Sequence, residues 1–372
     1  MKNSILNIYN LGIKELKTLF RDKVMAVLIV YSFTFAIYIG ATSQSTELHN
    51  ASIAFVDEDR STLSYRIIEA FYKPRFNTPD TIKLEQIDAN MDNGYYTFVI
   101  VLPSGFEEDV LSGKDVDIQV NIDATRMTQA GIGAGYIQNI IMQELSTFLN
   151  SSSSSKIKVI NRYKYNPNLT SSWFGSINEV INNIVMLSIL LSAAALIRER
   201  EYGTIEHLLV MPLSPIEIML SKIWSVCIIV LVCVAFSLVF VVQMLLHVPL
   251  SGSILLFLFA TLLVLFATTS MGIFMGTIVK NMPQLGMIFI ITILPLMMLS
   301  GGVSPFESMP KIIQSIMHFM PTSYFVEISQ EILFKGAGIE IVWSEMLKIF
   351  LIGVVFFTLT FLFFKRSLES QM

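Results

Sequence analysis

The stretch LIREREYGTIEHLLVMPLSP, residues 196–215, places a dense polar segment between two apolar segments of membrane length. Five charged side chains fall within nine positions, from Arg198 to Glu206, and two prolines follow. About 20 apolar residues cross a bilayer as a helix. The nearly uncharged segment 174–197 comes before the stretch, and no Lys, Arg, Asp or Glu occurs between Ile223 and Val279 after it. We therefore expect membrane spans on both sides of the polar segment.

The composition of the whole chain indicates an integral membrane protein. The 372 residues are 53% hydrophobic and 15% charged, and the mean hydropathy of +0.63 lies outside the range of ordinary soluble proteins. The net charge of −4 offers no basic field for nucleic acid. Segments of membrane length occur at 24–41, 174–197, 214–246, 253–279, 284–303 and 345–364. The sequence therefore predicts an all-α membrane bundle of six transmembrane helices.

The first apolar segment could instead be a secretory signal. However, 23 residues precede it, and the sequence after it, IGATSQ, is a poor cleavage site. We interpret it as a retained span.

Lys and Arg near the ends of the spans indicate the orientation of the chain. Eleven fall on one side, in residues 1–23, 198–222 and 365–372 and at Lys280. The opposite short connections, 247–252 and 305–344, contain only Lys311 and Lys335. Both termini and the tail 365–372 are therefore predicted to be cytoplasmic. Residues 42–172 are predicted to lie on the opposite, extracytoplasmic side.

Residues 4–21, within the N-terminal segment 1–23, have the spacing of an amphipathic helix. Its polar stripe includes Lys14, Lys17 and Arg21, and its apolar stripe recurs every three or four residues. A basic amphipathic helix is suited to the headgroup layer of a membrane. The alternative is a simple cytoplasmic extension of the first span.

Residues 42–172 are polar and alternate between strand and helix patterns, which predicts an inserted extracytoplasmic α/β domain. Helices are predicted at 61–72, with Ser61 as N-cap, at 105–113, closed by Gly113, and at 125–150. Strands are predicted at 52–59, 81–87, 95–103 and 115–124, and a last strand after the Ser-rich linker of 151–165.

Residues 304–344 contain two short amphipathic segments divided at Pro321, each too short or too polar to cross the membrane. We expect them to dip into the outer leaflet, because irregular backbone at that depth must be covered by protein or face water.

The sequence lacks the common motifs of catalysis and metal binding. It has no GxxxxGK[ST], HExxH or GxSxG motif, and His49, His207, His247 and His318 are scattered. We therefore predict no catalytic residue, no metal site and no cofactor in this chain. Glu179 is an ionisable residue within the predicted span 174–197, although ion-coupled carriers usually need several such residues inside the membrane. The energy for any transport is expected to come from outside the chain.

The polar segment 198–213 contains residues that end one helix and begin another. Arg198 and Arg200 mark the membrane boundary, Gly203 can break the helix, and Thr204 can cap a short new one. Ile205, Leu208 and Leu209 share one face of that short helix, and Pro212 ends it. Ser214-Pro215-Ile216-Glu217 then matches a capping box for the next span. A short helix with an apolar face fits the groove of a partner protein.

The run from Arg198 to Leu209 resembles the coupling-helix signature of ABC-2 type permeases, the membrane subunits of ATP-binding-cassette exporters. A second match resembles the outer re-entrant segment of the same family. It comprises Leu299, Ser300, Gly301, Gly302, Pro305, Glu307, Ser308, Met309, Pro310, Pro321, Tyr324, Lys335 and Gly336. Asn166-Pro167 is a third match, and the pattern covers all 372 residues. The large domain after the first span is similar to the drug- and multi-substrate-export branch, although FGSINEV at 174–180 replaces that branch's Pro-Gly pair.

The resemblance implies that two permease subunits, identical or paralogous, pair in the membrane above two separate ATPase subunits. ATP and Mg²⁺ would bind in those partners. It implies coupling roles for Arg198, Glu199, Arg200, Glu201, Gly203, Thr204, Glu206, Leu208 and Leu209. In this picture Glu201 and Glu206 contact the ATPase, the two arginines hold the membrane boundary, and Leu208 and Leu209 enter the groove. The outside domain could rest on a periplasmic adaptor, gate the exit, select substrate or stabilise the dimer.

Two other classes stay open from the sequence. An ion-coupled secondary transporter would need charged groups within the spans. A membrane-anchored sensor would need a cytoplasmic output domain, and the predicted cytoplasmic segments are short.

Overall fold

The computed structural model describes residues 2–43, 48, 50–123, 127–149, 170–203, 213–302, 306 and 309–369. The chain divides into two compact units. One comprises Met1–Ser43 and Ser172–Met372 and is called the membrane unit below. The other comprises Gln44–Ser171 and is called the inserted unit.

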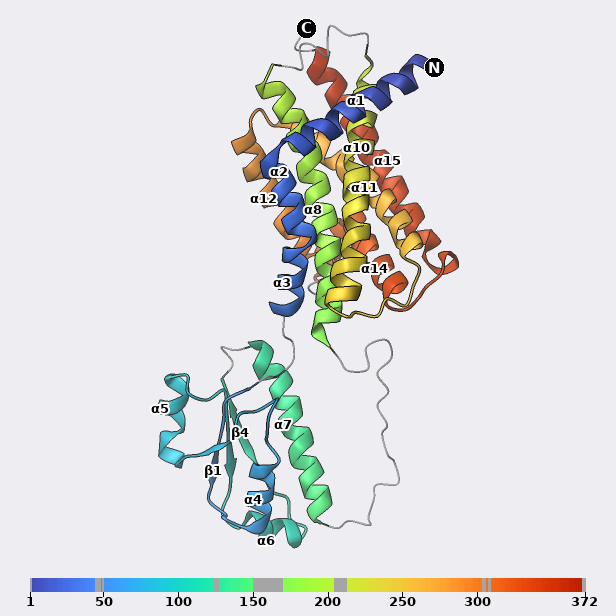
Figure 1. Cartoon of the computed structure of the whole chain (residues 1–372). Coiled ribbons are helices and arrows are strands. Elements are labelled where there is room, and N and C mark those ends of the chain that lie inside the picture. The colour runs from blue at the N-terminus through green and yellow to red at the C-terminus, as the bar shows by residue number, and fades with distance from the viewer. Residues whose placement is uncertain are drawn as a thin grey trace. The chain divides into compact units, whose positions relative to one another are not determined.

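The described part of the membrane unit is helical throughout its regular structure (Figure 1). Five helical stretches are long and apolar enough to cross a membrane, and a sixth apolar helix, α12, has only 17 residues. The helices are α1 (Lys2–Arg21), α2 (Lys23–Phe33), α3 (Phe35–Ser43), α8 (Ser171–Glu201), α10 (Pro215–Phe236), the π-helix η3 (Ser237–Leu245), α11 (Ile254–Ile278), α12 (Met282–Met298), α13 (Lys311–Met317), α14 (Pro321–Leu333) and α15 (Ile339–Glu369). The fold is therefore that of a helical membrane protein, and the count of six spans stays a prediction.

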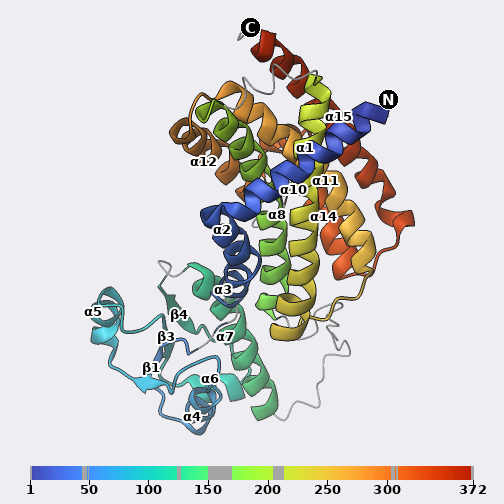
Figure 2. The ribbon, with the colours of Figure 1, turned by 45° about the horizontal axis from the view of Figure 1, so that its top comes forward.

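Helix α8 forms the centre of this unit (Figure 2). In its most apolar stretch 89% of the residues are buried, against 22% for α15. Gly272 and Gly276 of α11 lie so close to α8 that an added Cβ would overlap Ser192 or crowd Ala193. Small residues allow this approach, because packing replaces the hydrophobic effect between helices in lipid. The Ser188 hydroxyl also donates to Thr268 Oγ1 of α11 at 2.7 Å.

The first predicted span is not one continuous helix. It breaks at Thr34 between α2 and α3. The break frees the carbonyl of Ser32, and Asn183 Nδ2 of α8 donates to that oxygen at 2.9 Å. A freed backbone group in a span requires such a partner. The predicted span 284–303 also differs, because α12 ends at Met298 and Gly301 then adopts a φ of 96°.

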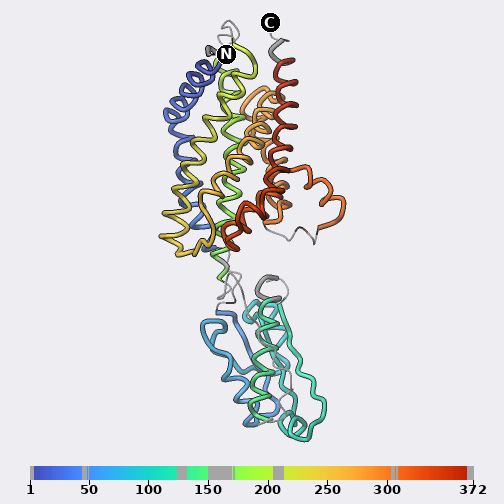
Figure 3. The backbone as a smooth tube through the Cα atoms, turned by 90° about the vertical axis from the view of Figure 1, so that its right-hand side faces the viewer, coloured from blue at the N-terminus to red at the C-terminus, as the bar shows by residue number. Residues whose placement is uncertain are grey.

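Figures 1 and 3 show α1 and the last turns of α15 at one end of the membrane unit, with α13 and α14 toward the other end. The chain between these two short helices turns at Pro321, which occupies the first turn of α14. Proline suits that position because its missing N–H would have no partner there.

The described residues of the inserted unit form a four-stranded sheet with helices on both faces. The strands β1 (Ile53–Asp57), β2 (Asp80–Thr81), β3 (Phe98–Leu102) and β4 (Gln119–Ile122) lie in the order β2-β1-β3-β4. β1 pairs parallel with β2 and β3, and β4 pairs antiparallel with β3. α4 (Thr62–Glu69) and α7 (Met127–Phe148) share an aromatic core with one face. α5 (Ile87–Asp92) covers the other, and α6 (Phe106–Leu111) follows β3.

The prediction of a strand at 81–87 is wrong beyond Thr81. A 3₁₀ turn, Leu84–Gln86, leads directly into α5. The Gln86 side chain accepts from the Lys83 N–H at 3.0 Å, and Leu84 is exposed. The alternation of apolar and polar residues at 81–87 therefore does not mark a strand here. It falls in a turn, and the apolar side chain of Leu84 faces water. Ser61 does cap α4, as predicted. The strand predicted after the Ser-rich linker lies outside the described residues.

Candidate functional site

One of the contacts that join the N-terminal helix α1 to α10 is made by a tryptophan. Trp224 Nε1 donates to the Ile8 carbonyl at 3.0 Å, and the indole stacks on Tyr9 with ring centroids 6.0 Å apart. Gly12 permits this contact, because a Cβ at that position would overlap the Trp224 ring. Lys17 and Arg21 remain exposed on the polar side of α1. Its location at a membrane surface stays a prediction.

Four charged side chains from α1, α8 and α10 form what we name the Lys222 cluster: Lys14, Glu15, Glu199 and Lys222. Lys222 Nζ lies 2.9 Å from Glu15 Oε1 and 2.7 Å from Glu199 Oε2. Lys14 Nζ lies 2.6 Å from Glu199 Oε1. Only 1% of the Lys222 side chain is exposed. Two acids and two bases balance in charge, which is the condition under which buried ions are tolerated.

Burial affects the acid that α1 contributes to the cluster. Desolvation raises the pKa of Glu15, and the neighbouring Glu199 carboxylate adds to that increase, whereas the Lys222 and Lys14 ammonium groups oppose it. The Glu15 carboxylate therefore depends on these lysines for its charge.

The last turn of α8 connects to four other parts of the unit through four consecutive residues. Arg198 pairs with Asp22, which caps the start of α2. Glu199 enters the Lys222 cluster. Arg200 donates to the Val279 carbonyl at the end of α11. Glu201 Oε1 accepts from the Met282 N–H, at 2.9 Å, where α12 begins.

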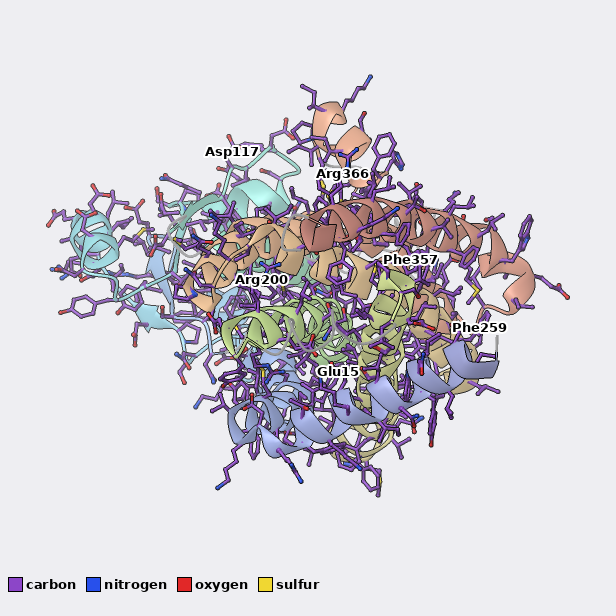
Figure 4. The ribbon with its side chains drawn as sticks, turned by 90° about the horizontal axis from the view of Figure 1, so that it is seen from above. Glu15, Asp117, Arg200, Phe259, Phe357 and Arg366 are labelled. Atoms are coloured by element: carbon purple, nitrogen blue, oxygen red, sulfur yellow. The ribbon has the colours of Figure 1, made fainter. Side chains whose placement is uncertain are left out.

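This arrangement follows from helix geometry. Successive residues of an α-helix point about 100° apart, so four of them cover the whole circumference. A charged residue in each direction allows α8 to bond to α2, α10, α11 and α12 at one level. Figure 4 looks at the unit from this end and labels Glu15 on α1 and Arg200 on α8. We call residues 198–201 the α8 hub.

The chain leaves the hub at the predicted break. α8 ends at Glu201, and Gly203 has a φ of 66°, the left-handed conformation that ends many helices. Residues 204–212 lie outside the described residues, so Thr204, Glu206, Leu208 and Leu209 keep their predicted roles without a structural account. The next helix begins with the predicted capping box, in which Ser214 N donates to Glu217 Oε2 at 2.8 Å.

The sequence-predicted residues of the re-entrant segment gather at the other end of the unit. Gly302 packs against Asn178, whose Nδ2 donates to the Gly302 carbonyl at 2.9 Å. Tyr324 Oη donates to the His318 carbonyl at 3.2 Å. Ser300 and Met309 are buried, and Pro310 and Pro321 precede or begin α13 and α14. Pro305, Glu307 and Ser308 lie outside the described residues.

Two residues of the Lys222 cluster are absent from the predicted site. Lys222 counts among the boundary charges in the sequence, and Glu15 lies in a helix expected to face the headgroups. The available signal is the position of Lys222, seven residues after Pro215 in an otherwise apolar helix. An ionisable residue in such a helix usually has a partner and a function. Among the described residues, no group of three His, Cys, Asp or Glu side chains could hold a metal ion.

The long apolar helices of the described residues are those of a multi-pass membrane protein. The chain belongs to the ABC-2 transporter family, because it matches the family described as "ABC-2 family transporter protein" over residues 24–362.

Three similar proteins have names that describe permeases. It is 52% identical over 368 residues to the inner membrane transport permease YhhJ of Escherichia coli (strain K12), and the match covers 98% of each chain. It is 26% identical over 363 residues to the probable multidrug ABC transporter permease YbhR of the same organism, covering 95% of this chain and 97% of that one. It is 27% identical to the probable multidrug permease YbhS over 385 residues, covering 99% and 100%. The protein is therefore a multi-pass inner-membrane permease.

Proposed function

We propose that this chain is the membrane subunit of an ATP-binding-cassette exporter. A separate subunit hydrolyses ATP, and the permease moves a small amphipathic compound, drug-like or lipid-like, outward across the inner membrane. The α8 hub is the observation that carries this proposal. Any displacement of the chain that follows Gly203 acts directly on the turn that is bonded to α2, α10, α11 and α12.

In this proposal the ATPase docks on residues 203–212. Glu206 and the exposed Glu201 contact it, and Leu208 and Leu209 enter its groove. ATP and Mg²⁺ bind in the partner. α1 then transmits movement through the Lys222 cluster, since it is joined to the hub by Glu15, Lys14 and Glu199. The names of the relatives YbhR and YbhS support a multidrug role for such a complex.

We further propose six spans, with both termini cytoplasmic and the inserted unit extracytoplasmic, where an adaptor protein could reach it. A second copy or a paralogue completes the transporter.

The test is a charge reversal at the ATPase contact. We expect Glu206→Lys to abolish ATP-driven dye uptake in inverted membrane vesicles that contain the permease and its ATPase, while the protein remains inserted. Glu340→Lys is the matched control, because Glu340 is an exposed acid at the start of α15. Normal uptake by Glu206→Lys would exclude this coupling site.

An ion-coupled carrier is the alternative, favoured by one observation. Glu179 of α8 is half-buried within the bundle, and its side chain lies where a Cβ on Gly40 of α3 would meet it. Buried ionisable groups in spans often serve as ion relays. Vesicles distinguish the two functions, because ATP-driven export continues when a protonophore collapses the proton gradient, whereas ion-coupled transport stops.

A further inference from the structure

A pocket of about 650 Å³ opens at the end of the membrane unit opposite α1. Its volume is within the range of small-molecule binding sites. Among the described residues, its walls include Phe174 at the start of α8, Gly301 and Phe306, and Tyr324 and Glu327 of α14. None of these residues belongs to the α8 hub or to the Lys222 cluster.

Aromatic rings supply much of the wall. Phe174 stacks on Phe334, with ring centroids 6.4 Å apart, and Phe306 packs edge-on against His318 at 5.2 Å. Tyr324 already accepts a cation from the protein, since Lys348 Nζ lies 5.1 Å from its ring centroid. Aromatic faces attract ammonium and other organic cations at such distances.

The charges at this pocket do not balance. Glu331 pairs with Lys335 at 3.6 Å, and Glu345 pairs with Lys348 at 3.4 Å. Among the described residues, Glu327 has no cation within 4.0 Å, and it lines the pocket. Among the described residues that line the pocket, the two carboxylates of Glu327 and Glu331 therefore face the one ammonium group of Lys335, which leaves one negative charge.

The surroundings of Glu327 agree with this imbalance. Partial burial raises the pKa of Glu327, and the carboxylates of Glu345 and Glu331 add to the increase, against the opposing Lys348 and Lys335. A positive ligand would relieve the repulsion among these acids.

We propose that this pocket binds amphipathic organic cations, with the cationic group beside Glu327 and the apolar part against Phe174, Phe306 and Tyr324. The inference that such cations are the transported substrate rests on the proposed export function. The inference that the pocket binds them does not rest on that function, because residues of this chain line the pocket.

The test uses the full-length protein in phosphatidylcholine nanodiscs and two probes of similar shape. Tetraphenylphosphonium is a cation and triphenylphosphine oxide is neutral. Equilibrium dialysis against empty nanodiscs measures the saturable binding of each. We expect Glu327→Gln to weaken tetraphenylphosphonium binding about tenfold and to leave binding of the neutral probe unchanged. Glu327→Asp should retain most of the affinity, and Glu340→Gln, which removes an exposed acid outside the pocket, should change neither probe.

Three results would overturn the proposal: no saturable tetraphenylphosphonium binding, equal affinity in Glu327→Gln, or an equal loss for the neutral probe. The export function is measured separately, as ATP-driven uptake in vesicles that contain the ATPase. Glu327-dependent binding without any ATP-driven transport would remove the export function and keep this site. ATP-driven transport without Glu327-dependent binding would keep the export function and exclude this binding site.

Discussion

Lys222 joins three helices through a single buried ammonium group. It contacts one carboxylate from α1 and one from α8, and it lies on α10. Removing a charged group from water costs several kcal/mol, which nearby opposite charges must offset. The cluster is therefore stable only as a set, and a change to one member affects the others.

The first prediction concerns this residue. Lys222→Met leaves Glu15 and Glu199 with only Lys14 between them, so we expect a loss of about 3–5 kcal/mol, as for other broken buried pairs. Thermal unfolding of the detergent-solubilised protein measures the change. The double variant Lys222→Met with Glu15→Gln restores neutrality and should recover much of the loss. Lys17→Met is the control, because Lys17 is exposed on the same helix as Glu15. An unchanged Tm for Lys222→Met would contradict the account of the cluster.

At this scale the sequence singles out some of the charged residues that the structure brings together. The charges at 198–201 stand out because they interrupt an apolar chain. Their partners do not, because Asp22 and Lys222 resemble ordinary boundary charges, and Glu15 lies 207 positions before its partner. Pairings over such separations depend on how helices pack, which single-residue patterns do not encode.

At the scale of elements, the contact between α1 and α10 depends on a missing side chain. Gly12→Ala places a Cβ within the Trp224 ring, so we expect α1 to separate from α10. In a variant whose other two tryptophans, Trp173 and Trp343, are replaced by Phe, acrylamide should quench Trp224 more strongly.

Gly286→Ala is the matched control for that experiment. Gly286 is also a helical glycine, but an added Cβ there meets no atom within 4 Å. Alanine should stabilise the helix at this position by up to about 1 kcal/mol. Equal quenching of Trp224 with and without the Gly12 change would show that α1 is held by other contacts.

Helix starts and breaks that depend on neighbouring residues are predicted well from the sequence. Those that depend on residues far away in the chain are not. The capping box at Ser214 and the break at Gly203 are encoded within a few residues. The break at Thr34 is different, because the group that satisfies Ser32 is Asn183, 151 positions away. The same holds for 81–87, where only the neighbouring strands decide which residues form the sheet.

At the scale of the whole molecule, the inserted unit should fold alone. Its sheet has a core on each face, including Phe55, Phe76 and Phe98, all fully buried. We expect the fragment 44–171 to unfold cooperatively by circular dichroism. Phe98→Ala should cost about 3–5 kcal/mol, whereas Tyr95→Ala, at a residue that is 65% exposed, should change little. A fragment without a cooperative transition would contradict the independence of this unit.

The orientation can be tested on intact spheroplasts. The distribution of Lys and Arg predicts that the inserted unit faces outward and α1 faces the cytoplasm. A membrane-impermeant thiol reagent should therefore label Glu85→Cys and leave Lys17→Cys unlabelled until the membrane is opened, since both positions are exposed. The native Cys227 is buried and Cys233 is half-buried, which keeps the background low. Labelling in the opposite pattern would reverse the proposed topology.

The α8 hub also has a consequence for the kinds of sequence change that the permease tolerates. Single substitutions at residues 198–201 remove one bond each. Inserting or deleting one residue just before Arg198 would instead rotate the whole turn by about 100° and aim every charge at the wrong neighbour. Length variation is usually harmless near the end of a helix. Here we expect the spacing between the centre of α8 and Arg198 to be fixed, even among relatives whose individual side chains differ.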